Sequence, residues 1–498
     1  MELNSKSSKI QSFYDDLFGF DTETTGLDKF PDTRPTGVAF LKYNSDFKNY
    51  LNLDISIRLP FGHFPSPGSM IVQDKFYSQI NSKNNLEFYD AMAKVKNFIS
   101  SKLRGKIICG HNINGFDTKQ LNVWFNKALY DPYPFQKKFG NYLIDTIPVA
   151  RFAKAIGGDH FKFQNFRLET LMQFFLGESY TQLHGAPEDV KDVFRLIEFT
   201  DKKLRLLKGK NLVEILQWYS SEINRKNVFS NSLILKPSNK GVFESVIPLS
   251  DCKSWKGYKI IIPFHKDKID WSGNDAEAVA NQIKSIASPS SISSKKEFVY
   301  PVDMQDKMSD IGENFLNKLP ITVQYLRSVV KLLRGDREFI NQCQISVDES
   351  RRKSKKPVSD YEGHYRDGDG FFDKDSDRMK FFHQAIPEKK REIIQSFENK
   401  GIRKNAKLFL FNKHPEVLSQ AEWDCMFEEI RDEFLDDKNT SRVTYASCYE
   451  EFDQIKQDVK NGKRVLSDRQ RDILDDYKVR LEAFKANPKR FWEQRHGY

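Results

Sequence analysis

The stretch Phe20-Asp21-Thr22-Glu23-Thr24-Thr25-Gly26 follows directly on the apolar run Leu17–Phe20 near the start of the chain. Such an apolar run is typical of a buried strand, and residues two apart on a strand face the same side of its sheet. Asp21 and Glu23 therefore present two carboxylates to one point at the strand end. Because buried carboxylates are costly unless a cation neutralises them, the stretch predicts a metal site. The alternative is a solvated strand end that leads into a turn.

The rest of residues 1–205 shows the alternation of strands and helices that is typical of an α/β domain. Val38–Leu41 and Tyr50–Ile55 are strand-like, and residues 86–103 carry apolar side chains at helical spacing. Lys106–Cys109 predicts one more strand.

A second acidic motif, Gly110-His-Asn-Ile-Asn-Gly-Phe-Asp117, comes directly after that last strand and before the next predicted helix. We expect Asp117 at the N-cap or in the first turn of the helix. Capping alone would explain an aspartate there, so the motif by itself does not require a function.

A third motif, His184-Gly-Ala-Pro-Glu-Asp189, opens a late helix. Pro187 is suited to the first helical position, which places Asp189 in the first turn and His184 in the preceding loop. A single histidine is more often a packed or exposed side chain than a catalytic base. Its spacing to an acid, after the two earlier acidic motifs, favours a catalytic role here.

The order and spacing of the three motifs match the DEDD signature of 3′→5′ exonucleases, in its histidine subclass. Four carboxylates can hold two Mg²⁺ ions, for which Mn²⁺ would substitute, around a phosphate that undergoes in-line displacement. His184, neutral near pH 7, would accept the proton of the attacking water. The predicted metal ligands are Asp21, Glu23, Asp117 and Asp189.

Segments outside these motifs resemble bacterial exonuclease I. They are Asp32–Pro35, Asn165–Leu171, Gly363–Arg378 and Lys407–Asn412. The resemblance implies an RNase H-like exonuclease domain at 1–205, an SH3-like β-rich domain at 206–350 and an all-helical domain at 351–498. It also implies a monomer that degrades single-stranded DNA to 5′-mononucleotides, processively, in DNA repair or recombination. The residues for which it implies substrate contacts are Thr24, Arg34, Asn112, Phe116 and Arg167.

Two positions depart from the family pattern. Gly115 stands where the family carries an arginine, so one substrate contact is in doubt. Pro148 replaces an arginine of the pocket that binds the acidic tail of single-strand DNA-binding protein, and Arg151 lies one helical turn further on. Recruitment by that partner is therefore a weaker expectation than catalysis.

Composition sets broad limits on the class of protein. The 498 residues carry a formal net charge of +10, which suits a polyanionic partner. The five cysteines form no CxxC pair, which argues against a zinc site and a disulfide scaffold. No stretch approaches the ~20 apolar residues of a membrane span, so we expect a soluble, cytoplasmic protein without membrane contacts.

Further along the chain, Ser285–Ser294 predicts a flexible loop and the basic run Arg351–Pro357 a domain boundary. Ser467 is expected to cap a late helix. Three other functions stay open from the sequence. One is RNA trimming or proofreading by a DEDD nuclease. Another is nucleic-acid binding by a catalytically inactive adaptor, and the third is use of the same chemistry in a phage or defence protein.

Overall fold

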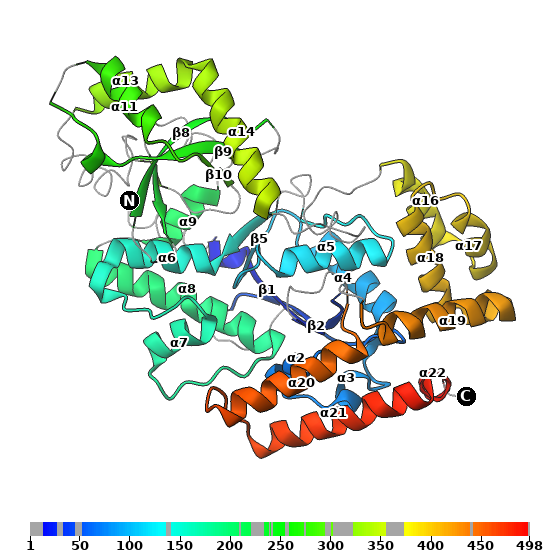
Figure 1. Ribbon diagram of the computed structural model, residues 1–498. Coiled ribbons are helices and arrows are strands. Elements are labelled where there is room, and N and C mark those ends of the chain that lie inside the picture. The colour runs from blue at the N-terminus through cyan, green and yellow to red at the C-terminus, as the bar shows by residue number, and fades with distance from the viewer. Residues whose placement is uncertain are drawn as a thin grey trace. The chain divides into compact units, whose positions relative to one another are not determined.

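The computed structural model describes residues 13–26, 33–44, 52–135, 141–208, 211–220, 234–238, 240, 243–253, 258–272, 275–293, 300–301, 322–354, 373–438 and 442–496. The chain divides into two compact units, each with helices and one β-sheet (Figure 1). Unit 1 comprises Met1–Tyr14, Asp145–Thr181 and Val193–Pro357. Unit 2 comprises Asp15–Ile144, Gln182–Asp192 and Val358–Tyr498.

Unit 2 contains a mixed six-stranded sheet in the order β4-β3-β2-β1-β5-β6. Its strands are β1 (Leu17–Thr24), β2 (Pro35–Lys42), β3 (Asn52–Arg58), β4 (Leu86–Glu87), β5 (Ile107–Gly110) and β6 (Tyr142–Asp145). β2 pairs antiparallel with both β1 and β3, whereas β1 pairs parallel with β5 and β3 with β4. The four strands expected from apolar runs in this part of the sequence are therefore confirmed.

Helices α4 (Phe88–Lys102) and α5 (Asp117–Lys127) pack on this sheet through a shared apolar core. Phe20 of β1 stacks on Phe40 of β2 with ring centroids 4.4 Å apart, and Met92 of α4 and Trp124 of α5 belong to the same core. The even-numbered residues of β1 thus face this core. Two short helices, α2 (Pro67–Gln73) and α3 (Tyr77–Ile80), follow β3.

The C-terminal helices belong to the same unit as this sheet. They are α16 (Asp373–Gln384), α17 (Pro387–Ile394), α18 (Lys400–Lys413), α19 (Gln420–Leu435), α20 (Tyr445–Lys460), α21 (Asp468–Ala486) and α22 (Pro488–His496). Phe382 of α16 and Leu410 of α18 are fully buried in the core that also contains Phe20. The expected cap is confirmed, because the Ser467 hydroxyl accepts from the Gln470 N–H at the start of α21.

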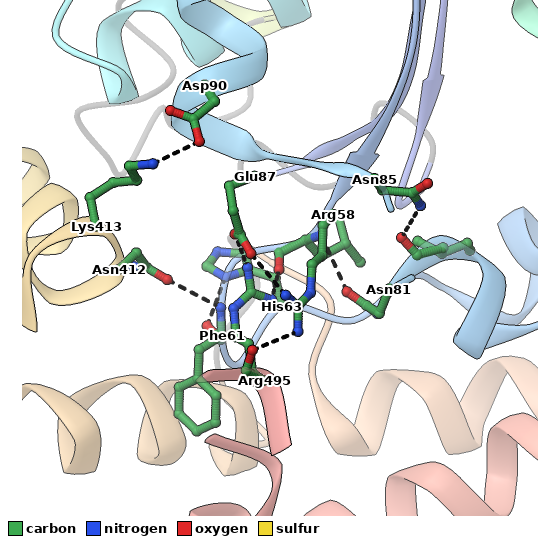
Figure 2. Close-up of polar contacts among 12 residues, drawn as sticks. Arg58, Phe61, His63, Asn81, Asn85, Glu87, Asp90, Asn412, Lys413 and Arg495 are labelled. Carbon is green, nitrogen blue, oxygen red and sulfur yellow. Dashed lines mark hydrogen bonds and ion pairs between the residues drawn. The ribbon is translucent and has the colours of Figure 1, made fainter. Parts of the chain in front are cut away.

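Polar contacts add to this packing at the end of β3 and β4 (Figure 2). Glu87 accepts hydrogen bonds from Arg58, at 3.0 Å, and from Arg495 of α22. We call these three residues the Glu87 cluster. Close by, the Phe61 N–H donates to Asn412 and Lys413 pairs with Asp90 at 2.6 Å. The cluster and its neighbours therefore join the C-terminal helices to the sheet.

Unit 1 contains an antiparallel sheet in the order β10-β9-β8-β7-β11. Its strands are β7 (Ile234–Pro237), β8 (Phe243–Asp251), β9 (Tyr258–Pro263), β10 (Ser290–Ser293) and β11 (Tyr300–Pro301). Its helices include α6 (Thr146–Gly157), α7 (Leu168–Leu176), α9 (Leu212–Ser220), α11 (Ala276–Ser285), α13 (Val323–Gly335) and α14 (Arg337–Ser354). The remaining helix, α8 (Ala186–Lys208), contributes residues 186–192 to unit 2.

One sequence-based expectation in this unit is wrong. Ser290–Ser293, which lies inside the predicted flexible loop, forms β10 and pairs with β9. The physical reason is Ile292, which is 1% exposed and anchors an otherwise polar segment in the core. The glycine- and phenylalanine-rich part of the family-like segment, residues 363–372, lies outside the described residues. Among the described residues, no helix combines the length and apolarity that a bilayer span needs.

Candidate functional site

The end of β1 places two carboxylates on the face opposite to the apolar core. Asp21 lies opposite Ala39 of β2 and Glu23 lies opposite Gly37, and the strand register shifts directly after Glu23. A Cβ atom on residue 37 would lie 3.4 Å from the Glu23 Cβ, so the glutamate side chain lies directly beside Gly37. The predicted common orientation of Asp21 and Glu23 is therefore confirmed.

The first turn of α8 brings a third carboxylate to the same place. Each of Asp21, Glu23 and Asp189 offers a carboxylate oxygen, and these oxygens lie within 4.8 Å of one another. We call these three residues the carboxylate cluster. The Asp189 N–H donates to the Gly185 carbonyl at 2.9 Å, which confirms the expected position in the first helical turn.

His184 precedes that helix in a left-handed backbone conformation, with φ at 47°. Residues other than glycine rarely adopt this conformation, and such strain concentrates at functional sites. The histidine charge lowers the pKa of Asp189, so the two side chains interact. The loop position predicted for His184 is thus confirmed, with its side chain only partly buried.

The fourth predicted ligand, Asp117, lies beside the carboxylate cluster but outside it. It is the first residue of α5, it is 2% exposed, and its carboxylate accepts a hydrogen bond of 2.6 Å from the Thr22 hydroxyl. Its charge still raises the pKa of both Asp21 and Glu23. The structure therefore brings three of the four carboxylates into one cluster and places Asp117 beside it, with its carboxylate turned toward Thr22.

In the turn before α5, Gly115 lies against the Asn112 side chain. Asn112 has φ at 60°, and its carbonyl accepts the N–H groups of Gly115 and Phe116. A Cβ atom on residue 115 would lie 2.1 Å from the Asn112 Oδ1. A longer side chain at position 115 would therefore displace the Asn112 side chain.

The electrostatics of the site show carboxylates whose negative charge is only partly compensated. Burial, followed by repulsion from Asp117, Asp189 and Glu23, raises the pKa of Asp21 well above its usual value. Burial and repulsion from Asp189 raise the pKa of Glu23 to about 8, and burial raises the pKa of Asp189 to about 6. Concentrated negative charge thus makes ionisation unfavourable in the protein alone.

These residues fit a divalent cation with a preference for oxygen ligands. Carboxylate oxygens are the ligands of Mg²⁺ and Mn²⁺, and a bound cation reverses the repulsion that raises these pKa values. In addition, the buried Asp189 Oδ1 forms no hydrogen bond with the described residues. An acceptor of this kind is costly to bury unless a cation or a donor meets it.

The five candidate substrate-binding residues have different surroundings. The Thr24 hydroxyl donates to the Gly26 carbonyl at 2.6 Å, and Arg34 is 3% exposed with its guanidinium 5.1 Å from the Phe88 ring centre. Asn112 is exposed and Phe116 partly exposed. Arg167 is exposed in unit 1, at the N-cap of α7. Their contacts with substrate stay predictions.

Sequence reasoning missed three residues that act on the carboxylates. Thr22 donates to Asp117, a side-chain hydrogen bond from Gln182 lowers the pKa of Asp189, and the charge of Lys75 lowers the pKa of Glu23. Thr22 and Gln182 lie within two residues of predicted site residues, which was a usable signal. Nothing in the sequence connects Lys75 with Glu23.

Comparison with solved structures identifies the fold. Exonuclease I from E. coli in complex with a dA16 oligonucleotide matches with a TM-score of 0.69 at 16% identity, over 94% of this chain and 99% of that one. The chain has the fold of exonuclease I. The moderately thermophilic exonuclease I from Methylocaldum szegediense matches with a TM-score of 0.68 at 14% identity, again over 94% and 99% of the two chains. No protein-family model and no curated protein matches the sequence.

The exonuclease I structures also include an E. coli complex with single-stranded DNA in a metal-free form, at 16% identity and a TM-score of 0.69 over 94% of this chain and 99% of that one. The resemblance that the sequence motifs suggested therefore extends to the fold along almost the whole chain. At these identities the resemblance concerns the fold alone.

Proposed function

We propose that this chain is a metal-dependent exonuclease that removes nucleotides from the 3′ end of single-stranded DNA and releases 5′-mononucleotides. The observation that carries the proposal is the carboxylate cluster, with Asp117 and His184 beside it, at the end of the central strand of an exonuclease I fold. Three separate segments of the chain supply these residues. In a purely structural cluster, compensating cations would be expected to keep the pKa values of the acids low, whereas here these values are raised.

Each residue of the site would have its own role in the reaction. Asp21, Glu23 and Asp189, together with Asp117, would hold two Mg²⁺ or Mn²⁺ ions. When bound, such ions neutralise charge on the phosphate and increase the acidity of water. His184 would accept the proton of the attacking water, because it lies next to Asp189 and is open to solvent. Thr22 would keep the Asp117 carboxylate oriented through its hydrogen bond.

The finer assignments rest on the family resemblance. We infer an RNase H-like domain within residues 1–205, an SH3-like domain within 206–350 and a helical domain from 351. We also infer processive action, a role in DNA repair, and a cytoplasmic monomer. The antiparallel sheet of unit 1 supports a β-rich middle region. Binding of the acidic tail of single-strand DNA-binding protein would have to use Arg151, whose guanidinium lies 5.5 Å from the Phe166 ring centre.

The deciding experiment is Mg²⁺-dependent digestion of a 5′-labelled single strand, with its duplex and an RNA of the same sequence as comparisons. We expect a ladder that shortens from the 3′ end of the single-stranded DNA alone, released mononucleotides, and no product with Asp21→Ala. A ladder on RNA instead would keep the site and change the substrate. Tight binding without any cleavage would favour the inactive adaptor.

A further inference from the structure

Helix α2 lies against the end of β1 and is fixed there by side-chain hydrogen bonds. Gln73, its last residue, donates to the Thr24 carbonyl at 2.8 Å and accepts from the Thr36 hydroxyl at 2.7 Å. Ser69 donates to the Thr25 carbonyl at 3.1 Å. The C-terminal end of α2 is therefore anchored to the two residues that directly follow Glu23.

Asp74, the residue after Gln73, is held in place by helix α21. Asp74 caps α2 in a left-handed conformation with φ at 50°, and its carboxylate pairs with Arg469 of α21 at 2.6 Å. Arg469 also donates to the Asp74 carbonyl at 3.1 Å. The backbone directly before Lys75 is therefore held in place by β1 on one side and by α21 on the other.

The charge of Lys75 acts on the face of the sheet that carries the carboxylate cluster. Asp54 of β3 lies in one row with Asp21, because both residues are paired with Ala39. Residues in one row of a sheet share a face. The anchoring of α2 to Thr24 and Thr25 brings Lys75 to the end of β1. Burial raises the pKa of both Glu23 and Asp54, and the charge of Lys75 offsets part of each rise.

Lys75 has no fixed partner for its charge. Its side chain is partly exposed and forms no hydrogen bond or ion pair with any described residue. Lys191 offers a useful contrast, because it also acts on Asp54 but pairs with Glu188 at 3.2 Å. Of these two lysines, Lys75 is therefore the one whose ammonium group has no hydrogen-bonding or ion-pair partner among the described residues.

We propose that Lys75 donates to a non-bridging oxygen of the phosphate that is cleaved, as a catalytic residue of this site. The proposal rests on the proposed function and adds a residue that the acidic motifs do not contain. Negative charge on the phosphate oxygens is best stabilised by donors that are already in place when the transition state forms. A tethered cation at the edge of four carboxylates meets that requirement.

The test compares Lys75→Gln, Lys75→Arg and Lys191→Gln in single-turnover hydrolysis of single-stranded DNA. We expect Lys75→Gln to slow hydrolysis about 10- to 100-fold with substrate affinity changed less than threefold. Lys75→Arg should restore most of the rate, because a guanidinium can donate to the same oxygen. Lys191→Gln removes an equal charge from the same surroundings and should stay within about twofold of the wild type.

Titration with Mn²⁺ separates this role from a structural one. A lysine near carboxylates repels a cation, so Lys75→Gln should bind Mn²⁺ as tightly as the wild type or more tightly. Weaker Mn²⁺ binding would show that Lys75 supports the site structurally and would overturn the proposal. So would equal rate losses in Lys75→Gln and Lys191→Gln, or a Lys75→Gln rate within twofold of an active wild type. An inactive wild-type protein would instead overturn the proposed function itself.

Discussion

Two clusters of charge in unit 2 are built in opposite ways. In the Glu87 cluster one carboxylate accepts from two guanidiniums, and the side chains of Arg58 and Arg495 are only 11% and 9% exposed (Figure 2). In the carboxylate cluster three acids lie together with Asp117 next to them, and the pKa values of Asp21, Glu23 and Asp189 are all raised. The first cluster compensates its charge within the chain, whereas in the second Lys75 and His184 offset only part of the burial and repulsion that raise the pKa values of the acids.

The difference separates a structural cluster from a functional one. Removing one partner from a buried ion pair leaves an uncompensated charge, so the Glu87 cluster should matter for stability. Carboxylates with raised pKa values reduce the stability of the folded protein at the pH where they ionise, and such groups cluster at functional sites. The carboxylate cluster should therefore matter for activity and weaken the metal-free protein.

His184→Ala provides the largest expected effect. The variant should lose about 10²–10⁴-fold in the rate of hydrolysis, because the base that accepts the proton of water is gone. Binding of single-stranded DNA and the melting temperature should change little, since His184 is partly exposed at a loop position. Rates at several pH values, with binding measured by fluorescence anisotropy, check this expectation. An equal loss of binding would make His184 a structural residue.

Glu87→Ala should lower the stability of the protein and leave its activity almost unchanged. Two buried guanidiniums lose their shared carboxylate, so we expect the free energy of unfolding to fall by about 2–4 kcal/mol. The rate of hydrolysis per folded molecule should stay within twofold, because the Glu87 cluster contributes no ligand to the carboxylate cluster. Urea denaturation measures the free energy of unfolding. Kinetics normalised to the concentration of active sites measure the rate of hydrolysis per folded molecule. Asp90→Ala, which removes only the exposed pair with Lys413, is the matched control and should cost less than about 1 kcal/mol.

Local patterns were enough to predict much of the carboxylate cluster. The apolar run before Asp21 predicted β1, and Pro187 predicted the start of α8, which together place three acids. Ser467 correctly predicted the cap of α21. Each of these predictions depends on residues that are close together in the sequence, where strand periodicity and helix capping act directly.

Contacts between distant segments could not be predicted in this way. Glu87 and Arg495 are 408 residues apart, and Thr22 and Asp117 are 95 apart. The orientation of Asp117 toward Thr22 and the position of Lys75 near Glu23 arise only when these segments pack. Ile292 likewise converts a polar, loop-like segment into a strand through burial, which a count of serines does not reveal.

The pH dependence of stability gives the smallest expected effect and bears directly on the carboxylate cluster. Because the folded-state pKa values of Glu23 and Asp189 are raised, to about 8 and about 6, the folded protein holds more protons than the unfolded chain. The stability of the metal-free protein should therefore fall as the pH rises from about 4 to about 8.

Glu23→Gln should reduce this fall and stabilise the metal-free protein at pH 8 by about 1–3 kcal/mol, because the pKa of Glu23 is raised further than that of Asp189. Thermal unfolding in EDTA between pH 5 and pH 8 measures the effect. Glu87→Gln provides the comparison. It should lower stability at every pH in this range without changing the slope of stability against pH. If Glu23→Gln left the slope unchanged, the negative charge of the carboxylate cluster would have to be compensated within the chain. The contrast with the Glu87 cluster would then fail.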